Sequence, residues 1–276
     1  MAKRPRASHK GDYGHVLIVA GSKGMAGAAV LNARGALRAG AGLVTVSIAE
    51  ELFPIIQIAV PEAMCAGRDP ETDLSEEKLK KYSSIALGPG IGTSEKATDL
   101  VSQLLKKYTG HIVLDADALN IIARMARSDE LSASDFPKIP PHSIATPHPG
   151  EAARLLGVSN EDISENRPAA LSALNEKLGC TICLKGSGTL VTPEYINTTG
   201  NPGMATGGAG DVLTGVIASL VAQGMAPQTA ARAGVYIHGL AGDIAVKKFG
   251  EYGLTAGDIA EHVAYAINKL SSEPSL

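Results

Sequence analysis

The sequence is poor in the features that mark several classes of protein. It contains only three cysteines, Cys65, Cys180 and Cys183, which are too few for the disulfide framework of a small secreted domain. No stretch approaches the roughly 18 apolar residues of a membrane span. The early apolar run "VLIVA" is shorter than the core of a signal peptide. We therefore expect a cytoplasmic protein with no membrane partner.

A large net charge and the common metal and nucleotide motifs are also missing. The net charge of −3 gives no electrostatic reason to expect nucleic-acid binding. Cys180 and Cys183 form a CxxC pair, but residues three apart on a strand point to opposite faces, which disfavours a shared metal. HExxH is absent, and so is any Gly-Lys dipeptide, which excludes a P-loop. The GxxGxxG spacing of "GSKGMAG" (21–27) disfavours a Rossmann dinucleotide site.

What the sequence does contain is an alternation of short apolar segments with longer Ala/Leu-rich ones. Near-continuous apolar runs are typical of strands that are covered on both faces. The pattern predicts an α/β fold with a mostly parallel central sheet and helices on both of its faces. The expected strands are 15–21, 42–48, 83–88, 111–116, 142–147, 181–186 and 189–192; the expected helices include 27–40, 95–108, 151–157 and most of the chain after Val212.

The organisation of the chain points to one domain. Its 276 residues suit one large α/β domain or two small ones. The polar loops 67–77 and 128–141 lack the composition of a flexible linker, and no internal repeat is found. We expect a single domain over residues 1–276, in which the basic segment "MAKRPRASHK" (1–10) is a flexible tail.

Loops that contain glycine, acid or histidine follow several of the expected strands. Ligands of open α/β sheets bind at the carboxyl ends of the strands, so these loops together predict a substrate cleft. Asp115 and Asp117 lie in one of them, "LDADALN" (114–120). They are expected either to cap the next helix or to orient a substrate or a metal-bound water. The loops are 20–27, 87–92, 114–120, 146–151 and 184–189.

A glycine-rich stretch, "TTGNPGMATGGAGDVLTG" (198–215), runs into an apolar segment that we expect to be helical. The free amides at the start of a helix form a natural anion site, and Gly208, Ala209 and Gly210 would supply them here. Asp211 has two interpretations. It is either the N-cap of the helix or a general base that takes a proton from a hydroxyl attacking a phosphoryl group. Both roles can coexist.

Together these motifs resemble the ribokinase-like superfamily, whose members end a glycine-rich anion-hole loop in a catalytic aspartate. The resemblance is much closer to one family within it, the NAD(P)H-hydrate dehydratases, and implies a ribokinase-like three-layer sandwich. It covers nearly the whole chain and rests on the number and order of the motifs. They are 8–31, 38–46, "LGPGIG" (87–92), "VLDADALN" (113–120), "TPHPGEAARLLG" (146–157), "LKGSGTLV" (184–191) and 197–224.

The resemblance implies the repair of a damaged cofactor. The family acts on the 6-hydroxy hydrates of NADH and NADPH, and it uses a nucleotide because hydroxide is a poor leaving group. ADP or ATP phosphorylates the hydroxyl, and elimination of phosphate then restores the reduced ring. Asp211 matches the base, and the amides of "GGAGD" would hold the transferring phosphate. ADP is the expected donor, because a short stand-alone chain resembles the members that prefer it.

The resemblance also assigns binding residues. Without it, Lys185 has a second interpretation as a solubility residue of an edge strand, and His148 as an ordinary loop histidine. The implied contacts to the hydrate are Ala28, Gly90, His148 and Asp211; those to the adenine nucleotide are Lys185, Gly186, Ser187, Gly188, Thr189 and Gly210.

A magnesium role is expected for Glu151. Related sugar kinases carry an NxxE motif whose glutamate organises magnesium-bound water near the phosphates. Here the motif reads "HPGE" (148–151), with histidine in place of asparagine. We expect Glu151 to act on Mg²⁺ through water, although an acid is also favourable in the first turn of a helix. Mg²⁺ itself is expected as the companion of the nucleotide phosphates.

Two alternatives stay open: a small-molecule kinase of the same fold, such as a vitamin-precursor kinase, and a non-catalytic nucleotide sensor. The motifs "MAGAA", "LGPG" and "TPHPGE" favour the dehydratase, and Asp211 argues against the sensor. Many family members carry an amino-terminal epimerase domain, whereas the resemblance here begins at Ser8. We therefore expect action on the S epimer alone, with a separate epimerase in the same pathway. The resemblance also implies a homo-oligomer, which we expect to be a tetramer.

Overall fold

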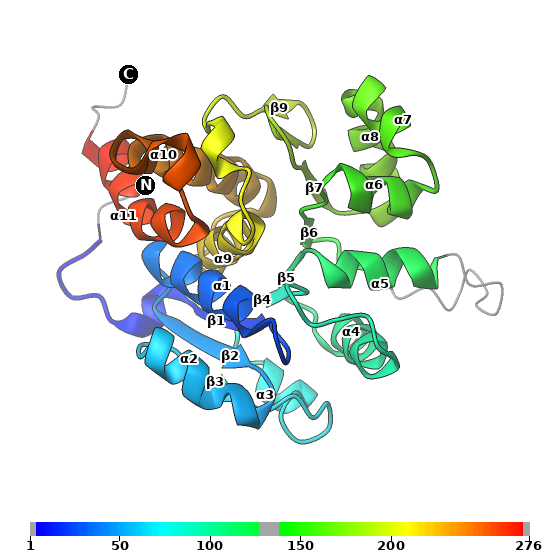
Figure 1. Cartoon of the computed structure of the whole chain (residues 1–276). Helices are drawn as coiled ribbons and strands as arrows, with labels where there is room; N and C mark the ends of the chain where they lie inside the picture. The colour runs from blue at the N-terminus through cyan, green and yellow to red at the C-terminus, as the bar shows by residue number, and fades with distance from the viewer. Residues whose placement is uncertain (1–3, 127–137, 273–276) are drawn as a thin grey trace.

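The computed structural model describes residues 4–126 and 138–272. Within them nine strands form one sheet in the order β3-β2-β1-β4-β5-β6-β7-β8-β9 (Figure 1). Pairing is parallel from β3 to β7, and β8 and β9 extend the sheet by antiparallel pairing. The strands are β1 His15–Val19, β2 Leu43–Ser47, β3 Met64–Ala66, β4 Ser84–Leu87, β5 His111–Leu114, β6 Ile144–Ala145, β7 Thr181–Leu184, β8 Leu190–Val191 and β9 Tyr195–Ile196.

Helices cover both faces of this sheet, which gives three layers. Alternate side chains of β1 enter two different cores: Val16 and Ile18 one, Leu17 and Val19 the other. The expected α/β fold with a mostly parallel sheet is confirmed. The first face carries α1 Ala26–Arg38, α2 Phe53–Ala59, α9 Ala209–Ala222, α10 Pro227–Gly253 and α11 Ala256–Ser272; the second carries α3 Glu76–Leu79, α4 Glu95–Lys107, α5 Asp117–Met125, α6 Pro149–Leu156, α7 Asn160–Glu165 and α8 Arg167–Leu178.

Every strand expected from the sequence has a counterpart, although the observed strands are shorter. The edge strands β3 and β9 were not expected. "MCA" in β3 has no β-branched residue, and β9 is too short to show an alternating pattern. Helices α1, α4 and α6 begin within two residues of the expected positions.

Part of the expected basic tail is described. Arg4 stacks on the ring of Tyr13 at 3.6 Å and donates a hydrogen bond to the carbonyl of Gly40. Residues 1–3, and most of the expected loop 128–141, lie outside the described residues. Among the described helices, none has the length and apolar character needed to cross a membrane.

Helices α1 and α9 pack backbone against backbone, and α9 is the helix that carries Asp211. A Cβ atom at Gly215 would lie 2.0 Å from the carbonyl oxygen of Asn32 and 2.9 Å from the amide nitrogen of Ala36. We expect Gly215→Ala to force the two helices apart and to lower the free energy of unfolding by about 3 kcal/mol or more. Urea denaturation of the variant measures this loss.

Gly27→Ala is the matched control. Gly27 also lies in α1, but a Cβ atom there would meet no atom of another element within 4 Å. This change is expected to leave the free energy of unfolding unchanged or to raise it by up to about 1 kcal/mol, because alanine favours helix. Equal losses in the two variants would contradict the close-packing explanation.

Candidate functional site

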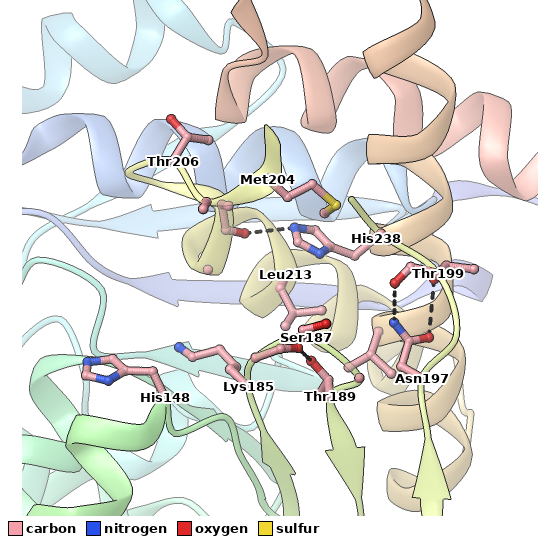
Figure 2. A pocket seen from close by; sticks show the side chains of 18 of the residues that line it. His148, Lys185, Ser187, Thr189, Asn197, Thr199, Met204, Thr206, Leu213 and His238 are labelled. Atoms are coloured by element: carbon pink, nitrogen blue, oxygen red, sulfur yellow. Dashed lines mark hydrogen bonds between the residues drawn. The ribbon is translucent and has the colours of Figure 1, made fainter. Parts of the chain in front are cut away.

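A cavity of about 830 Å³ lies between the β7–β8 hairpin, segment 197–206 and the first turn of α9. This volume suits a ligand of drug or cofactor size. Figure 2 shows His148 and Lys185 along one wall and Thr206 and His238 along the other. The site residues predicted from the sequence that line the cavity are His148, Glu151, Lys185, Gly186, Ser187, Gly188, Thr189, Ala209, Gly210 and Asp211.

The glycine-rich segment delivers free amides to this cavity. Gly208 is the N-cap of α9 and has a φ of 90°, a left-handed conformation that glycine adopts without strain. Ala209 N donates to Thr206 O at 3.4 Å. The amides of Gly210 and Asp211 have no partner within the described chain, as expected for the first turn of a helix. The positive end of α9 therefore faces the cavity with two free donors, those of Gly210 and Asp211. Of the three amides expected from the sequence only that of Gly210 is among them, because Ala209 N is engaged within the segment and Gly208 does not line the cavity.

Asp211 is the third residue of α9, so the N-cap interpretation is wrong. The helix begins earlier than expected because Gly208, rather than the aspartate, makes the turn into it. The carboxylate lines the cavity instead. Burial, together with the negative charges of Asp115 and Asp117, raises the pKa of Asp211 to about 7, against the opposing effect of Lys185. A carboxylate with this pKa can exchange a proton near neutral pH.

Asp115, at the end of β5, links the two sides of the site. It is almost fully buried, and its Oδ1 lies 2.6 Å from Lys185 Nζ. Its Oδ2 accepts a hydrogen bond from Thr214 Oγ1 of α9 at 2.8 Å. Burial opposes the charge of Lys185, but the carboxylates of Asp115 and Glu151 outweigh it and raise the pKa of the lysine. Lys185 is therefore a partly buried ammonium held by a buried carboxylate.

His148 and Glu151 form a capping box at the start of α6. Glu151 Oε2 accepts from His148 N at 2.8 Å, and Gly150 N donates to His148 Nδ1 at 3.0 Å. Because Nδ1 accepts, Nε2 carries the proton; it lies 3.2 Å from Glu151 Oε1. Burial raises the pKa of Glu151 to about 7, although Lys185 lowers it.

The site is short of positive charge. Asp115, Glu151 and Asp211 lie around Lys185, and the raised pKa values of Glu151 and Asp211 reflect burial and the negative charge of Asp115. No group of three or more potential metal ligands occurs among the residues that the structure describes. These observations fit a cation that binds mainly through phosphates and water, as Mg²⁺ does, rather than an all-protein metal cage.

Ala28 and Gly90 come together, but outside the lining of the cavity. A Cβ atom at Gly90 would lie 3.1 Å from Ala28 Cβ, and Gly90 has a φ of 65°. Gly21 N donates to Pro89 O at 2.7 Å and joins the two loops. The structure therefore groups Ala28 with Gly90, and His148 with the nucleotide residues.

The expectation that Asp115 or Asp117 caps a helix is wrong. The N-cap of α5 is Ala116, with a φ of 50° and no side-chain capping bond. Asp117 Oδ2 instead accepts from Gly92 N at 2.9 Å and holds the loop that follows β4. Both carboxylates are therefore used in tertiary contacts between strand ends.

Sequence analysis did not identify the residues that fix segment 197–206. Asp243 of α10 accepts from Gly200 N at 2.9 Å and from Asn201 Nδ2 at 3.0 Å. His238 Nε2 lies 2.9 Å from Ala209 O, and burial lowers the pKa of this histidine to about 4, so it is neutral. The glycines of "HGLAGD" (238–243) are the signal in the sequence, because they let the segment approach α10 closely.

Comparison with known proteins agrees with this geometry. The model of the NAD(P)H-hydrate dehydratase family matches residues 16–264. The bifunctional NAD(P)H-hydrate repair enzyme Nnr of Coxiella burnetii is 43% identical over 272 residues, which cover 97% of this chain and 53% of the relative. The chain spans about half the length of such bifunctional relatives. The ADP-dependent (S)-NAD(P)H-hydrate dehydratase of Neisseria meningitidis serogroup B is 38% identical, with 97% of this chain and 90% of the relative covered.

Solved structures show the same fold. The ADP/ATP-dependent NAD(P)H-hydrate dehydratase of Bacillus subtilis, co-crystallised with ATP and Mg²⁺, has a TM-score of 0.84 and 30% identity, with 98% of this chain and 94% of that one covered. A ribokinase-like superfamily protein of Enterococcus faecalis has a TM-score of 0.83 and 29% identity, with 97% and 91% covered. These matches show that this chain belongs to the NAD(P)H-hydrate dehydratase family of the ribokinase-like superfamily.

Proposed function

We propose that this chain dehydrates the S epimer of hydrated NADH and NADPH, with ADP as the phosphoryl donor. One observation carries the proposal: the carboxylate of Asp211 and the free amides of the first turn of α9 face the same cavity. A base and an anion site on a single turn bring together the two groups that phosphorylation of a hydroxyl requires.

Asp211 takes the proton of the 6-hydroxyl group as that oxygen attacks the terminal phosphorus of ADP. The bond from this phosphorus to the AMP oxygen breaks, and the amides of Gly210 and Asp211 stabilise the charge on the transferring group. The phosphate then leaves the ring carbon with the electrons of the C–O bond. The neighbouring carbon gives up a proton to solvent, and the electrons of that C–H bond re-form the double bond. Each NADH regenerated thus accompanies one AMP and one phosphate.

The remaining residues bind and orient. Residues 185–189 and Gly210 contact the adenine nucleotide, while His148, Ala28 and Gly90 contact the hydrate. Glu151 would hold Mg²⁺ through water. The cation would offset the negative charge that the phosphates add to a site already rich in carboxylates. The ADP dependence of the Neisseria relative supports ADP as the donor. The co-crystal of the Bacillus relative with ATP and Mg²⁺ supports Mg²⁺.

The proposal extends to partners and location. An NAD(P)H-hydrate epimerase would supply the S epimer from the R epimer. Homo-oligomerisation, with a tetramer as the first expectation, remains a prediction from the resemblance to the family, and a cytoplasmic location remains a prediction from the sequence.

The pH dependence follows from Asp211. Its carboxylate acts as a base only when deprotonated, and its pKa in the free protein is about 7. We expect kcat/KM for the hydrate to fall about tenfold for each pH unit below 7. A kcat/KM that stays constant from pH 8 to pH 5 would contradict Asp211 as the base.

The proposal is tested with purified chain, Mg²⁺ and the S hydrate of NADH. Return of the near-ultraviolet absorbance of reduced nicotinamide is expected with ADP, more slowly with ATP, and not without nucleotide. The pure R hydrate is the control, and its turnover should not exceed spontaneous epimerisation. No return with either nucleotide would overturn the proposal.

A further inference from the structure

Arg167, the first residue of α8, is hydrogen-bonded to the backbone of the nucleotide loop "KGSGT" (185–189) and of the residue before it. Its guanidinium donates to the carbonyl of Ser187 at 2.6 Å, of Leu184 at 3.1 Å and of Lys185 at 3.3 Å. Arg167 is half-buried and does not line the cavity. Its side chain pairs with no carboxylate within the described part of the chain, and these three carbonyls are the hydrogen-bond partners of its guanidinium there.

The planarity of the peptide bond gives these contacts a consequence on the other side of the loop. In a trans peptide the C=O of one residue and the N–H of the next point in opposite directions. When Arg167 holds the carbonyls of Lys185 and Ser187, the amides of Gly186 and Gly188 are turned away from it. Both glycines line the cavity, and neither amide has a partner among the residues described.

The loop needs such a support. Gly186 and Gly188 have φ values of 138° and 61°, and glycine populates many other conformations at little cost. A loop of this kind loses more conformational entropy on binding than an already ordered one, and that loss weakens affinity. The planar fork of an arginine engages several carbonyls at once, which a lysine ammonium does less well.

We propose that Arg167 is a positioning residue for nucleotide binding: it holds the loop so that the Gly186 and Gly188 amides point at the adenine nucleotide. The inference rests on the proposed nucleotide dependence. It assigns to Arg167 an effect on nucleotide affinity, with no part in the chemical step, which belongs to Asp211.

The test is calorimetric titration of the whole chain with ADP and with AMP. Arg167→Met is expected to raise Kd and the KM for ADP at least tenfold, with kcat at saturating ADP and the KM for the hydrate within about threefold of wild type. Arg167→Lys should give an intermediate Kd, since it keeps the charge but loses the fork. In ¹H–¹⁵N spectra, AMP should shift the Gly186 and Gly188 amides of the wild type and shift them less in Arg167→Met.

Arg34→Met is the matched control, because Arg34 also donates to a backbone carbonyl, that of Ala59, at 3.1 Å. It should bind ADP as the wild type does. If Arg167→Met binds ADP with a Kd within twofold of wild type, the inference about Arg167 is overturned while the proposed function stands. The same holds if Arg167→Lys has the wild-type Kd for ADP. If Arg167→Met does not fold, the inference is tested with Arg167→Lys, by its Kd for ADP and by the AMP-induced shifts of its Gly186 and Gly188 amides. Absence of nucleotide binding in the wild type would overturn the proposed function as well.

Discussion

Asp211→Asn is expected to lower kcat by about 10²- to 10⁴-fold, the usual contribution of a general base. Asparagine keeps the size of the side chain but cannot accept the proton of the hydroxyl. The amides of Gly210 and residue 211, and the loop 185–189, are unchanged, so Kd for ADP should stay within a few-fold of wild type. Turnover measured with the S hydrate, and ADP titration of the same preparation, test both parts. An Asp211→Asn protein with full activity would contradict the assignment.

The same variant should be more stable than the wild type at neutral and alkaline pH. The folded-state pKa of Asp211, about 7, lies above the value of 3.8 expected in the unfolded chain. Its contribution to stability is therefore fully present below pH 3.8 and is lost as the pH rises through 7. We expect a gain in Tm of a few degrees at pH 8, since about 1 kcal/mol shifts Tm by roughly 2 to 4 °C at this size. The gain should disappear near pH 4.

Lys185→Met is expected to lower the free energy of unfolding by about 3 to 5 kcal/mol, because it leaves the buried carboxylate of Asp115 without its counter-charge. The distance of 2.6 Å between Nζ and Oδ1, and the 2% exposure of the Asp115 side chain, make this the most buried ion pair of the described residues. Nucleotide binding should weaken as well, since Lys185 lines the cavity. Urea denaturation at pH 7.5 measures the loss of stability.

A double variant separates the ion pair from other effects of the methionine. Asp115→Asn removes the charge that Lys185→Met leaves unpaired, so the double variant should be more stable than Lys185→Met alone. We expect a coupling free energy of about 2 kcal/mol or more in the four-membered cycle. Nucleotide binding should not recover with the stability. Simple additivity of the two losses would show that the pair is not coupled.

The layer structure could be predicted because the signals that carry it are local. Apolar runs such as 15–21 mark strands covered on both faces, and the glycine-rich segment before Asp211 marks the start of a helix. The role of Asp211 as a base follows from its place beside that segment and remains a prediction. The position of Asp211 within α9 could not be predicted as well. The helix begins at the turn made by Gly208, and that turn depends on how α10 holds segment 197–206.

The supports of the site could not be predicted from the sequence. Arg167 acts on carbonyls 17 to 20 residues away, and Asp243 acts on an amide 43 residues away. Their backbone partners have no identity that a sequence pattern can show. The capping interpretation of Asp115 and Asp117 was wrong for the same reason: their partners, Lys185 and the amide of Gly92, come from other strand ends. Sequence patterns indicated which loops meet, whereas the hydrogen-bond and ion-pair partners of these side chains depend on tertiary contacts.

The most direct test of the account is the product balance of one reaction, in which the S hydrate of NADH is incubated with the chain, Mg²⁺ and ADP. Dehydration predicts one inorganic phosphate and one AMP for each NADH regenerated, with no phosphorylated nicotinamide at the end. A stable phosphate ester, formed without return of the reduced nicotinamide absorbance, would contradict the account and identify the chain as a small-molecule kinase.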